Sequence, residues 1–273
     1  MKSISAILVI VYLVMPLISF TQPNALPKTR HSFIVVAHRG DHTAAPENTL
    51  AAYQNAINNE VDFVEIDLRT TKDSQLVVMH DASLTKMTGV NMLVKDITLD
   101  SLRNLKVRDA MHTEWGFHNV PTFTEVLQLC KGKIGIYLDF KNASVAIAYQ
   151  YILAARMEKE IVVYINAPQQ FSDWRKVAPK MPLMISLPIA VTTTAQMDSV
   201  LLKYPVDILD GNYSEYNAVT VAAAKQKGIQ IWADIQGINE ANNWKKALLL
   251  GLVGLQTDHP KALIEFLKAK ALR

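Results

Sequence analysis

The sequence predicts an α/β fold, a (β/α)8 TIM barrel with an insertion after the second strand. From Phe33 onward, short β-branched runs alternate with longer helical segments, which is typical of parallel βαβ units. Polar residues stand late in, or just after, several of these runs, and in a closed barrel such strand ends meet at one mouth. A doubly wound open sheet would give the same alternation, but its widely separated strand ends would not all meet.

Eight runs are expected to be barrel strands, and they are apolar enough to be covered by helices. They are residues 33–37, 63–69, 134–140, 161–165, 183–187, 206–209, 229–233 and 254–257. Helices are expected at residues 50–58, 123–130, 144–159, 194–203, 218–227, 239–250 and 261–270.

The connection from Thr70 to Thr122 is about fifty residues long, far more than a usual strand-to-helix connection. We interpret it as a small extra strand at residues 76–79, which brings His80 back to the mouth, followed by an insertion at about 81–121. A helical turn is expected at residues 98–102. The insertion is expected to lie over the catalytic face and to shape substrate access.

The N-terminal 22 residues are expected to be a signal peptide. Lys2 precedes the apolar run from Ile4 to Phe20, and polar residues follow, which is the pattern of a secretory signal. The protein is therefore expected to be exported, periplasmic or secreted, with residues 23–32 as a linker and 33–273 as the barrel domain. Because no clear small-x-small cleavage site is present, an uncleaved membrane anchor is the alternative.

Charge and composition argue against a nucleic-acid partner and exclude an intrachain disulfide. The net charge is +3 over 273 residues, and no Lys/Arg cluster indicates a nucleic-acid partner. Cys130 is the only cysteine, so no intrachain disulfide can form; its apolar surroundings predict a buried helix residue. Half of the residues are hydrophobic, enough for one large core or two smaller ones.

Glu65 and Asp67 are the first pair of candidate site residues. They stand two positions apart in an expected strand, so both side chains point to the same face. Two like charges on an inward face repel each other unless a cation is present, and a bound metal would supply it. The alternative is a pair of carboxylates salt-bridged to Arg39 and Lys141 in the barrel interior.

Asp139 and Lys141 are a second pair of same-facing polar residues on a strand. Asp139 would complete a site of three carboxylates, and such hard oxygen ligands favour one Mg²⁺ or Ca²⁺ over zinc. Lys141 would bind a phosphate oxygen as a point charge. The alternative for Lys141 is a solvated lysine at a strand end.

His38 and His80 are candidates for a general acid and base, because an unperturbed imidazole titrates near neutral pH. Either histidine alone would more often be structural, but both coincide with the acidic pair. Arg39 offers a bidentate fork to phosphate oxygens, and Gly40 would let the backbone approach a ligand closely. Together these groups suit metal-assisted cleavage of a phosphate diester.

This set of residues resembles the glycerophosphodiester phosphodiesterase family, within the larger group of barrel enzymes that includes phosphatidylinositol-specific phospholipases C. The matching stretches extend over nearly the whole chain after its N-terminal segment. They are Ala37-His38-Arg39-Gly40, Pro46-Glu47-Asn48-Thr49, Glu65-Ile66-Asp67, Thr71-Lys72-Asp73, His80-Asp81, Leu138-Asp139-Phe140-Lys141 and Gly254-Leu255-Gln256-Thr257-Asp258-His259-Pro260.

The resemblance implies a (β/α)8 barrel that hydrolyses small-molecule glycerophosphodiesters to sn-glycerol 3-phosphate and an alcohol. No stable membrane association is expected once the signal is removed. By the family's pattern, the acid/base pair would be His38 and His80, the metal ligands Glu65 and Asp67, and the phosphate contacts Arg39 and Lys141.

The chain departs from the family's pattern at two places. The third metal ligand is usually glutamate, whereas this chain has Asp139, whose shorter arm sets the carboxylate farther back. The run Ile231-Trp232-Ala233-Asp234-Ile235 replaces a Trp-Thr-Val-Asn-like run. Trp232 is retained and is expected to wall the glycerol site and so bind substrate, while the changed neighbours are compatible with other head groups.

Two further classes of function stay open from the sequence. One is a phospholipase-type phosphodiesterase that acts on intact lipid and needs an exposed apolar rim. The other is a non-catalytic phosphodiester-binding protein. For the enzyme, one imidazole would take a proton from the nucleophile, which is water or the substrate's neighbouring glycerol hydroxyl. The other, assigned to His80, would protonate the departing alkoxide.

Overall fold

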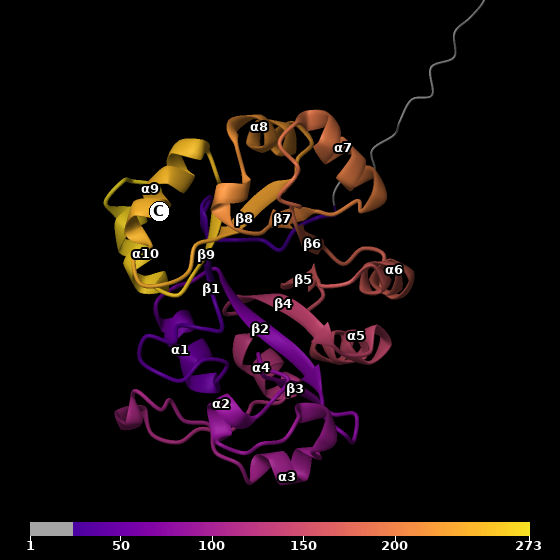
Figure 1. Cartoon of the computed structure of the whole chain (residues 1–273), viewed down its shortest axis with the longest axis vertical. Coiled ribbons are helices and arrows are strands. Elements are labelled where there is room, and N and C mark those ends of the chain that lie inside the picture. Colours follow the sequence, from indigo (N-terminus) through magenta and orange to yellow (C-terminus); the bar gives the residue numbers. More distant parts are fainter. Residues whose placement is uncertain (1–23) are drawn as a thin grey trace, which may run out of the picture.

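A computed structural model describes residues 24–273, so the expected signal peptide or anchor lies outside the described residues. Within residues 24–273, eight parallel strands pair in the order β1, β2, β4, β5, β6, β7, β8 and β9, and β9 pairs with β1 to close the sheet (Figure 1). A short strand, β3, pairs antiparallel with β2 outside the closed barrel. The predicted (β/α)8 barrel is confirmed.

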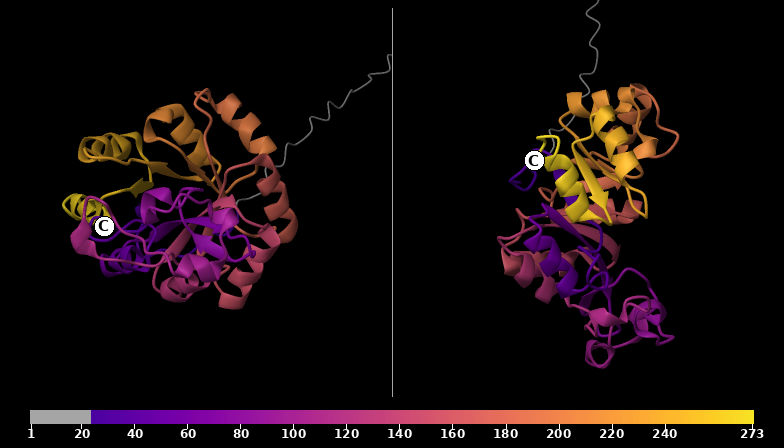
Figure 2. Two further views of the ribbon diagram at one scale, coloured as in Figure 1. Left: turned by 60° about the horizontal axis from the view of Figure 1, so that its bottom comes forward. Right: turned by 90° about the vertical axis from the view of Figure 1, so that its left-hand side faces the viewer.

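The strands all fall on runs that the sequence singled out, including the small extra strand. They are β1 (Ile34–Ala37), β2 (Phe63–Thr70), β3 (Leu76–Val78), β4 (Gly135–Asn142), β5 (Ile161–Ile165), β6 (Leu183–Ser186), β7 (Ile208–Asp210), β8 (Gln230–Asp234) and β9 (Gly254–Thr257). Helices surround the barrel (Figure 2). They are α1 (Leu50–Asn58), α4 (Phe123–Cys130), α5 (Val145–Ala155), α6 (Pro168–Val177), α7 (Thr194–Lys203), α8 (Ala218–Gln226), α9 (Ala241–Leu250) and α10 (Pro260–Lys268).

Two helices differ from expectation. α6 was not among the expected helices, because its sequence is mostly polar. It begins with Pro168, whose fixed φ suits the first helical position, and it buries Trp174. α5 ends at Ala155 instead of reaching Lys159, because Arg156 adopts a left-handed conformation with φ 58° and caps the helix.

Alternation along each strand separates two apolar cores. In β2, Val64, Ile66 and Leu68 face the core between the barrel and the helices, while Phe63 faces the barrel interior. The lower interior is filled by apolar side chains, namely Ile34, Val36, Phe63, Tyr137, Val162, Met184, Ile208 and Trp232. Polar residues follow them toward the C-terminal strand ends, so the barrel has an apolar lower half and a polar mouth.

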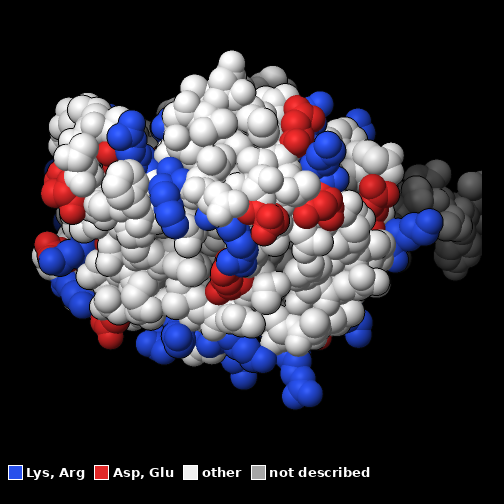
Figure 3. All heavy atoms as spheres, turned by 90° about the horizontal axis from the view of Figure 1, so that it is seen from below, with Lys and Arg blue, Asp and Glu red and all other residues white. Residues whose placement is uncertain are grey.

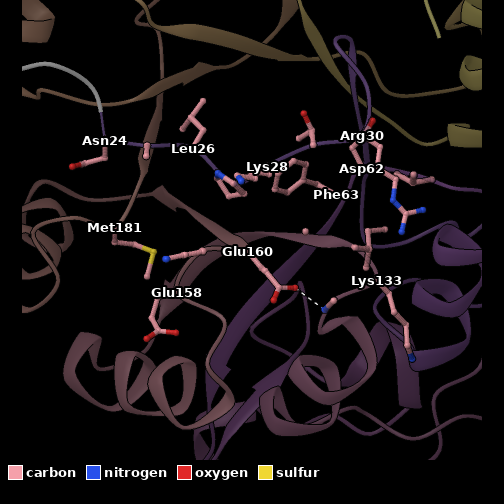
Figure 4. Close-up of a pocket in the computed structure, with 18 of the residues that line it drawn as sticks. Asn24, Leu26, Lys28, Arg30, Asp62, Phe63, Lys133, Glu158, Glu160 and Met181 are labelled. Carbon is pink, nitrogen blue, oxygen red and sulfur yellow. Dashed lines mark hydrogen bonds between the residues drawn. The ribbon is translucent and has the colours of Figure 1, made fainter.

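Residues 24–32, expected to form a linker, lie against the barrel floor. Leu26 packs on the interior apolar cluster, and the backbone amide of Asn24 donates to Asp207. Beside this segment is a cavity of about 1080 Å³. Figure 4 shows that both basic and acidic side chains line it, among them Lys133 and Glu158. None of the predicted catalytic residues lines this cavity, so it is not the predicted active site.

The insertion has a small core of its own. It contains α2 (Thr85–Thr88), α3 (Leu99–Arg103) and 3-10 turns at Val94–Asp96 and Thr113–Trp115, and it projects at the bottom of Figure 1. Its core is formed by Val77, Met79, Leu84, Met87, Val94, Ile97, Leu102, Val107 and Val120. On the face seen from below, charges of both signs lie between broad uncharged areas (Figure 3). Among residues 24–273, no helix has the length and apolarity to cross a bilayer.

The two ends of the described chain are joined to the barrel by one buried carboxylate. Asp62 Oδ1 lies 2.7 Å from His31 Nδ1. Its Oδ2 accepts hydrogen bonds from the backbone amide of Val35 at 2.9 Å and from Arg273 Nη1 at 2.6 Å. We predict that Asp62→Asn lowers the free energy of unfolding by about 2–4 kcal/mol, because it leaves the Arg273 guanidinium buried without its counter-ion.

Urea unfolding of the purified protein measures this effect. The matched control is Glu60→Gln, which removes only an exposed carboxylate 3.9 Å from Lys268; a change within about 0.5 kcal/mol is expected. Equal, small effects of the two variants would show that Asp62 does not hold the chain ends.

Candidate active site

Strand register brings the three predicted carboxylates together at the mouth. Asp67 and Asp139 are direct partners across β2 and β4, so their side chains lie side by side on the inner face. Glu65 precedes Asp67 by two residues and shares that face. Ligand oxygens of the three residues all lie within 4.8 Å of one another. The structure therefore gathers Glu65, Asp67 and Asp139 closely enough to hold one metal ion.

Neutral donors hold these carboxylates in place. Asn48 Nδ2 donates to Asp67 Oδ2 at 2.7 Å, and the buried Tyr53 hydroxyl in turn donates to Asn48 Oδ1 at 2.7 Å. Asn166 Nδ2 donates to Asp139 Oδ1 at 2.6 Å. All three donors, Asn48, Tyr53 and Asn166, were missing from the predicted site residues. Asn166 directly follows β5, which was the only sequence signal for it.

The backbone of the β1–α1 loop contributes directly to the site. The Arg39 amide donates to Glu65 Oε2 at 2.7 Å. Arg39 and Asn48 both have positive φ, 53° and 55°, and the Asn48 amide donates to the Arg39 carbonyl at 2.9 Å. Gly40 has φ 84°, and a Cβ there would come within 2.8 Å of Ala52 in α1. Glycine therefore allows close packing on α1, and the approach of this backbone to a ligand stays a prediction.

The local charge balance is negative. Glu65 and Asp67 are 3 % and 0 % exposed. Burial, followed by the neighbouring Asp67 and Asp139, raises the pKa of Glu65 well above its usual range. Burial and Asp67 likewise raise the pKa of Asp139. Burial would also raise the pKa of Asp67, but Lys141 and other nearby groups outweigh it and keep that pKa low.

Lys141 is the cation of this cluster. Its Nζ lies 3.1 Å from Asp67 Oδ1 and 2.5 Å from Asp139 Oδ2, so it is not the solvated lysine of the alternative interpretation. Asp67 and Asp139 raise its pKa against the opposing effect of burial. Arg39 is less available to the cluster, because Nη1 donates to both oxygens of Glu47, at 3.1 and 3.0 Å. Three carboxylates and one lysine leave two negative charges when all are ionised.

A divalent cation fits this balance. Asp67 Oδ1 is buried, and its contact with a cation among the described residues is the ion pair with Lys141 Nζ. Arg39 Nε is buried and donates no hydrogen bond among the described residues, although it lies 3.8 Å from Asp67 Oδ2. Buried carboxylate oxygens are ligands that a divalent cation prefers, and a guanidinium nitrogen that donates no hydrogen bond suits a phosphate oxygen. The residues present are therefore suited to a cation and a phosphate together. The salt-bridge interpretation accounts for the contacts of Lys141 and Arg39 with Asp67, but it leaves the cluster with more carboxylates than cations.

Each predicted histidine is oriented by a carboxylate. His38 Nδ1 lies 2.7 Å from Asp258 Oδ1, and Asp258 Oδ2 accepts a hydrogen bond from the Gly237 amide at 2.9 Å. His80 Nδ1 lies 2.7 Å from Asp81 Oδ1. With Nδ1 engaged in this way, the Nε2 atom of each ring is left to exchange a proton. Asp258 lies just after β9, as the strand-end argument required, but its contact with His38 could not be predicted from the sequence.

The β2–β3 hairpin returns His80 to the level of the carboxylates. The Met79 amide donates to the Asp67 carbonyl at 2.9 Å. Arg69 Nε donates to the Met79 and His80 carbonyls at 3.0 and 2.9 Å. Arg69 was missed from the sequence, because only the pairing of the hairpin shows that a residue of β2 contacts the chain beside His80.

Trp232 is not at the mouth, contrary to the prediction that it walls the substrate. It is 1 % exposed, and its ring centroid lies 4.7 Å from that of Phe63 in the interior apolar cluster. A Cβ at Gly254 would come within 2.5 Å of the indole, so the ring fills space above a glycine of β9. Trp232 faces inward, but it lies one pleat below the mouth, where Asp234 stands instead.

The fold and the site define a barrel hydrolase of phosphate diesters, because an acidic cluster suited to a cation and two carboxylate-oriented imidazoles share one mouth. Comparison with known proteins agrees. The model of the glycerophosphoryl diester phosphodiesterase family matches residues 38–262. The chain belongs to this family, and it is a phosphoric diester hydrolase.

Individual relatives cover most of the chain. The glycerophosphodiester phosphodiesterase of Caldanaerobacter subterraneus is 25% identical over 86% of this chain and 98% of its own. Lysophospholipase D of Rattus norvegicus is 29% identical over 85% of each chain. An Oleispira antarctica phosphodiesterase, solved in complex with the product sn-glycerol-3-phosphate, superposes with a TM-score of 0.72. It is 22% identical over 86% of this chain and 96% of that one, which supports the fold.

We predict that a divalent cation stabilises the protein, and that the effect grows with pH. The cation needs ionised ligands, whereas burial and its two acidic neighbours favour the protonated form of Glu65 by raising its pKa. At a cation concentration about a hundredfold above Kd, the Tm should rise by ~5–10 °C near pH 8 and by less near pH 5. Thermal unfolding with and without Mg²⁺ or Ca²⁺ measures this shift.

Asp67→Asn is the matched control, and it should abolish most of the shift. A wild-type protein whose Tm at pH 8 does not respond to either cation would contradict the assignment of the ligands.

Proposed function

We propose that this protein hydrolyses glycerophosphodiesters to sn-glycerol 3-phosphate and an alcohol, with one divalent cation, Mg²⁺ or Ca²⁺, held by Glu65, Asp67 and Asp139. The observation that carries the proposal is the cluster of three carboxylates whose ligand oxygens lie within 4.8 Å of one another. When bound, the cation supplies charge neutralisation and Lewis acidity to the phosphate.

The chain's own residues bind the phosphate and move protons. Lys141 and Arg39 lie beside the carboxylates and offer donors to non-bridging oxygens. One imidazole removes a proton from the nucleophile, which is water or the neighbouring glycerol hydroxyl. The other gives a proton to the departing alkoxide, and we assign this second role to His80. Asp258 and Asp81 act through the imidazoles by fixing which ring nitrogen is free.

A lysophospholipid is the second candidate substrate. The rat relative is named lysophospholipase D, and Met111 and Phe117 of the insertion are 89 % and 70 % exposed. The insertion is joined to the site loop, because Lys86 Nζ lies 2.8 Å from Glu47 Oε1, and Glu47 also binds Arg39. Exposed apolar side chains on this element suit an acyl chain better than a small polar alcohol.

Release of sn-glycerol 3-phosphate from glycerophosphocholine tests the proposal. We expect turnover that EDTA abolishes and that Mg²⁺ or Ca²⁺ restores. Choline release from lysophosphatidylcholine, measured in parallel, separates the two candidates. Turnover that is indifferent to chelation would refute the metal-dependent reaction, and absence of hydrolysis with both cations would refute the function.

We expect each histidine to act together with the carboxylate that orients its ring. We expect His38→Ala and His80→Ala each to lower kcat by about two to four orders of magnitude. Asp258→Asn should lower kcat while changing KM little, because it leaves the site in place but releases the His38 ring.

A double-mutant cycle distinguishes orientation of His38 from a general structural effect. If Asp258 acts through His38, the variant carrying both His38→Ala and Asp258→Asn should be no slower than His38→Ala alone. Additive losses would show that Asp258 acts independently of the imidazole.

A further inference from the structure

The floor of the barrel, at the N-terminal ends of its strands, carries an excess of positive charge. The floor is made of the segment before β1, the connections from each barrel helix to the next strand, and the residues after α10. These stretches are residues 24–33, 59–62, 131–134, 156–160, 178–182, 204–207, 227–229, 251–253 and 269–273. They contain ten lysines and arginines and five acidic residues, out of 28 and 25 in the whole sequence. The rest of the sequence is therefore slightly acidic, and the floor is the basic end of the barrel.

Five exposed cations surround the floor cavity. They are Lys28, Arg30, Lys133, Lys159 and Lys180. None of the five has an ion-pair partner among residues 24–273. Two of the acids that line the cavity, Glu60 and Asp62, already have basic partners outside the five. The other two, Glu158 and Glu160, are too few to neutralise the cations. Figure 4 shows Lys28, Arg30 and Lys133 around this one cavity.

Stabilisation of helices does not account for all of these cations. Cations near the C-terminus of a helix interact favourably with its dipole, which is a structural reason for the lysines that follow helices. Lys28 and Arg30 precede β1 and belong to no helix. Their segment is nevertheless held on the floor, because Leu26 packs on the interior apolar cluster and the Asn24 amide donates to Asp207. The segment thus adds its cations to those of the barrel.

The apolar N-terminal run joins the described chain at this same end of the barrel. The run ends at Phe20, four residues before Asn24, and four residues of chain span at most about 15 Å. An apolar segment held in a bilayer would therefore bring the floor to the bilayer surface. The mouth, at the other ends of the strands, would be turned away from it. The basic end of the barrel thus coincides with the point of attachment.

We propose that the barrel floor binds an anionic lipid surface, with the five cations beside the phosphate headgroups and the mouth turned toward water. Lysines and arginines close to an anionic bilayer are attracted to it, and a basic patch strengthens the binding that a single apolar anchor provides. The orientation leaves the mouth open to water-soluble substrates. The floor is at the other end of the barrel from the three carboxylates, so this inference does not depend on the proposed reaction.

Binding of the full chain to vesicles tests this surface. One set of vesicles is phosphatidylcholine alone, and the other is phosphatidylcholine mixed with phosphatidylglycerol. An apolar anchor enters both, so the ratio of the two partition coefficients reports the charged surface. We expect the wild type to prefer the anionic vesicles, and less so at raised salt. The ratio should fall about tenfold to a hundredfold when Lys28→Gln, Lys133→Gln and Lys180→Gln are combined.

The matched control combines Lys95→Gln, Lys106→Gln and Lys261→Gln. It removes the same charge from exposed positions in the insertion and at the start of α10, and it should keep most of the preference. Both triple variants should keep the wild-type Tm, because the replaced side chains are exposed. Equal losses of preference in the two variants would show that net charge alone sets the binding and would overturn the proposal. A wild type that partitions equally into the two kinds of vesicle would also overturn it.

Lysine acetylation locates the contact independently of the variants. With anionic vesicles present, a water-soluble acetylating reagent should modify Lys133, Lys159 and Lys180 more slowly than in their absence. Lys95 and Lys261 should keep their rates, and mass spectrometry of the peptides reads each position. Protection of the insertion lysines in place of the floor lysines would overturn the orientation, because it would put the mouth against the lipid.

Discussion

The parallel register of β2 and β4 is the constraint on which the site depends. Because Asp67 is paired with Asp139, two carboxylates are forced side by side on a buried face, and Glu65 adds a third. Charges in such an environment are costly unless they are paired. Lys141 offsets one of them, and its placement coincides with an irregularity in the same strand pair, where Leu68 and Arg69 shift register against β4. The remaining negative charge makes the cluster suited to a cation.

Several segments are shaped to support this arrangement. The β1–α1 loop takes two left-handed residues, Arg39 and Asn48. It thereby presents a backbone amide to Glu65 and a side-chain amide to Asp67. Such conformations cost free energy at non-glycine positions, and the hydrogen bonds to the buried carboxylates offset that cost. The β2–β3 hairpin positions His80, because Arg69 Nε donates a hydrogen bond to the His80 carbonyl. The left-handed loop residues and the hairpin pairing therefore both hold groups of the site in position.

Much of the site could be predicted because strand periodicity is a strong signal. The spacing of Glu65 and Asp67 predicted that their side chains share one face of a strand. The position of Asp139 at another strand end predicted the third carboxylate of the cluster. Depth within the barrel could not be predicted in this way. Trp232 and Asp234 have the same inward parity, yet one lies in the apolar interior and the other at the mouth, because tilt and register set the height of each strand. The contacts of Asn48, Asn166 and Asp258 also depend on strand tilt and register, which cannot be predicted from the sequence.

The mouth is electrically uneven, and this unevenness can orient a phosphate diester. Arg39 in the β1–α1 loop and Lys141 on β4 lie beside the acidic cluster. The opposite wall, formed by β7 and β8, offers Asp210 and Asp234 without a salt-bridged cation among the described residues. With a divalent cation held by the three carboxylates, the first wall would be the more positive side, and an anionic phosphate would be drawn to it and away from the aspartates of the second. Orientation then follows from charge before any close contact forms.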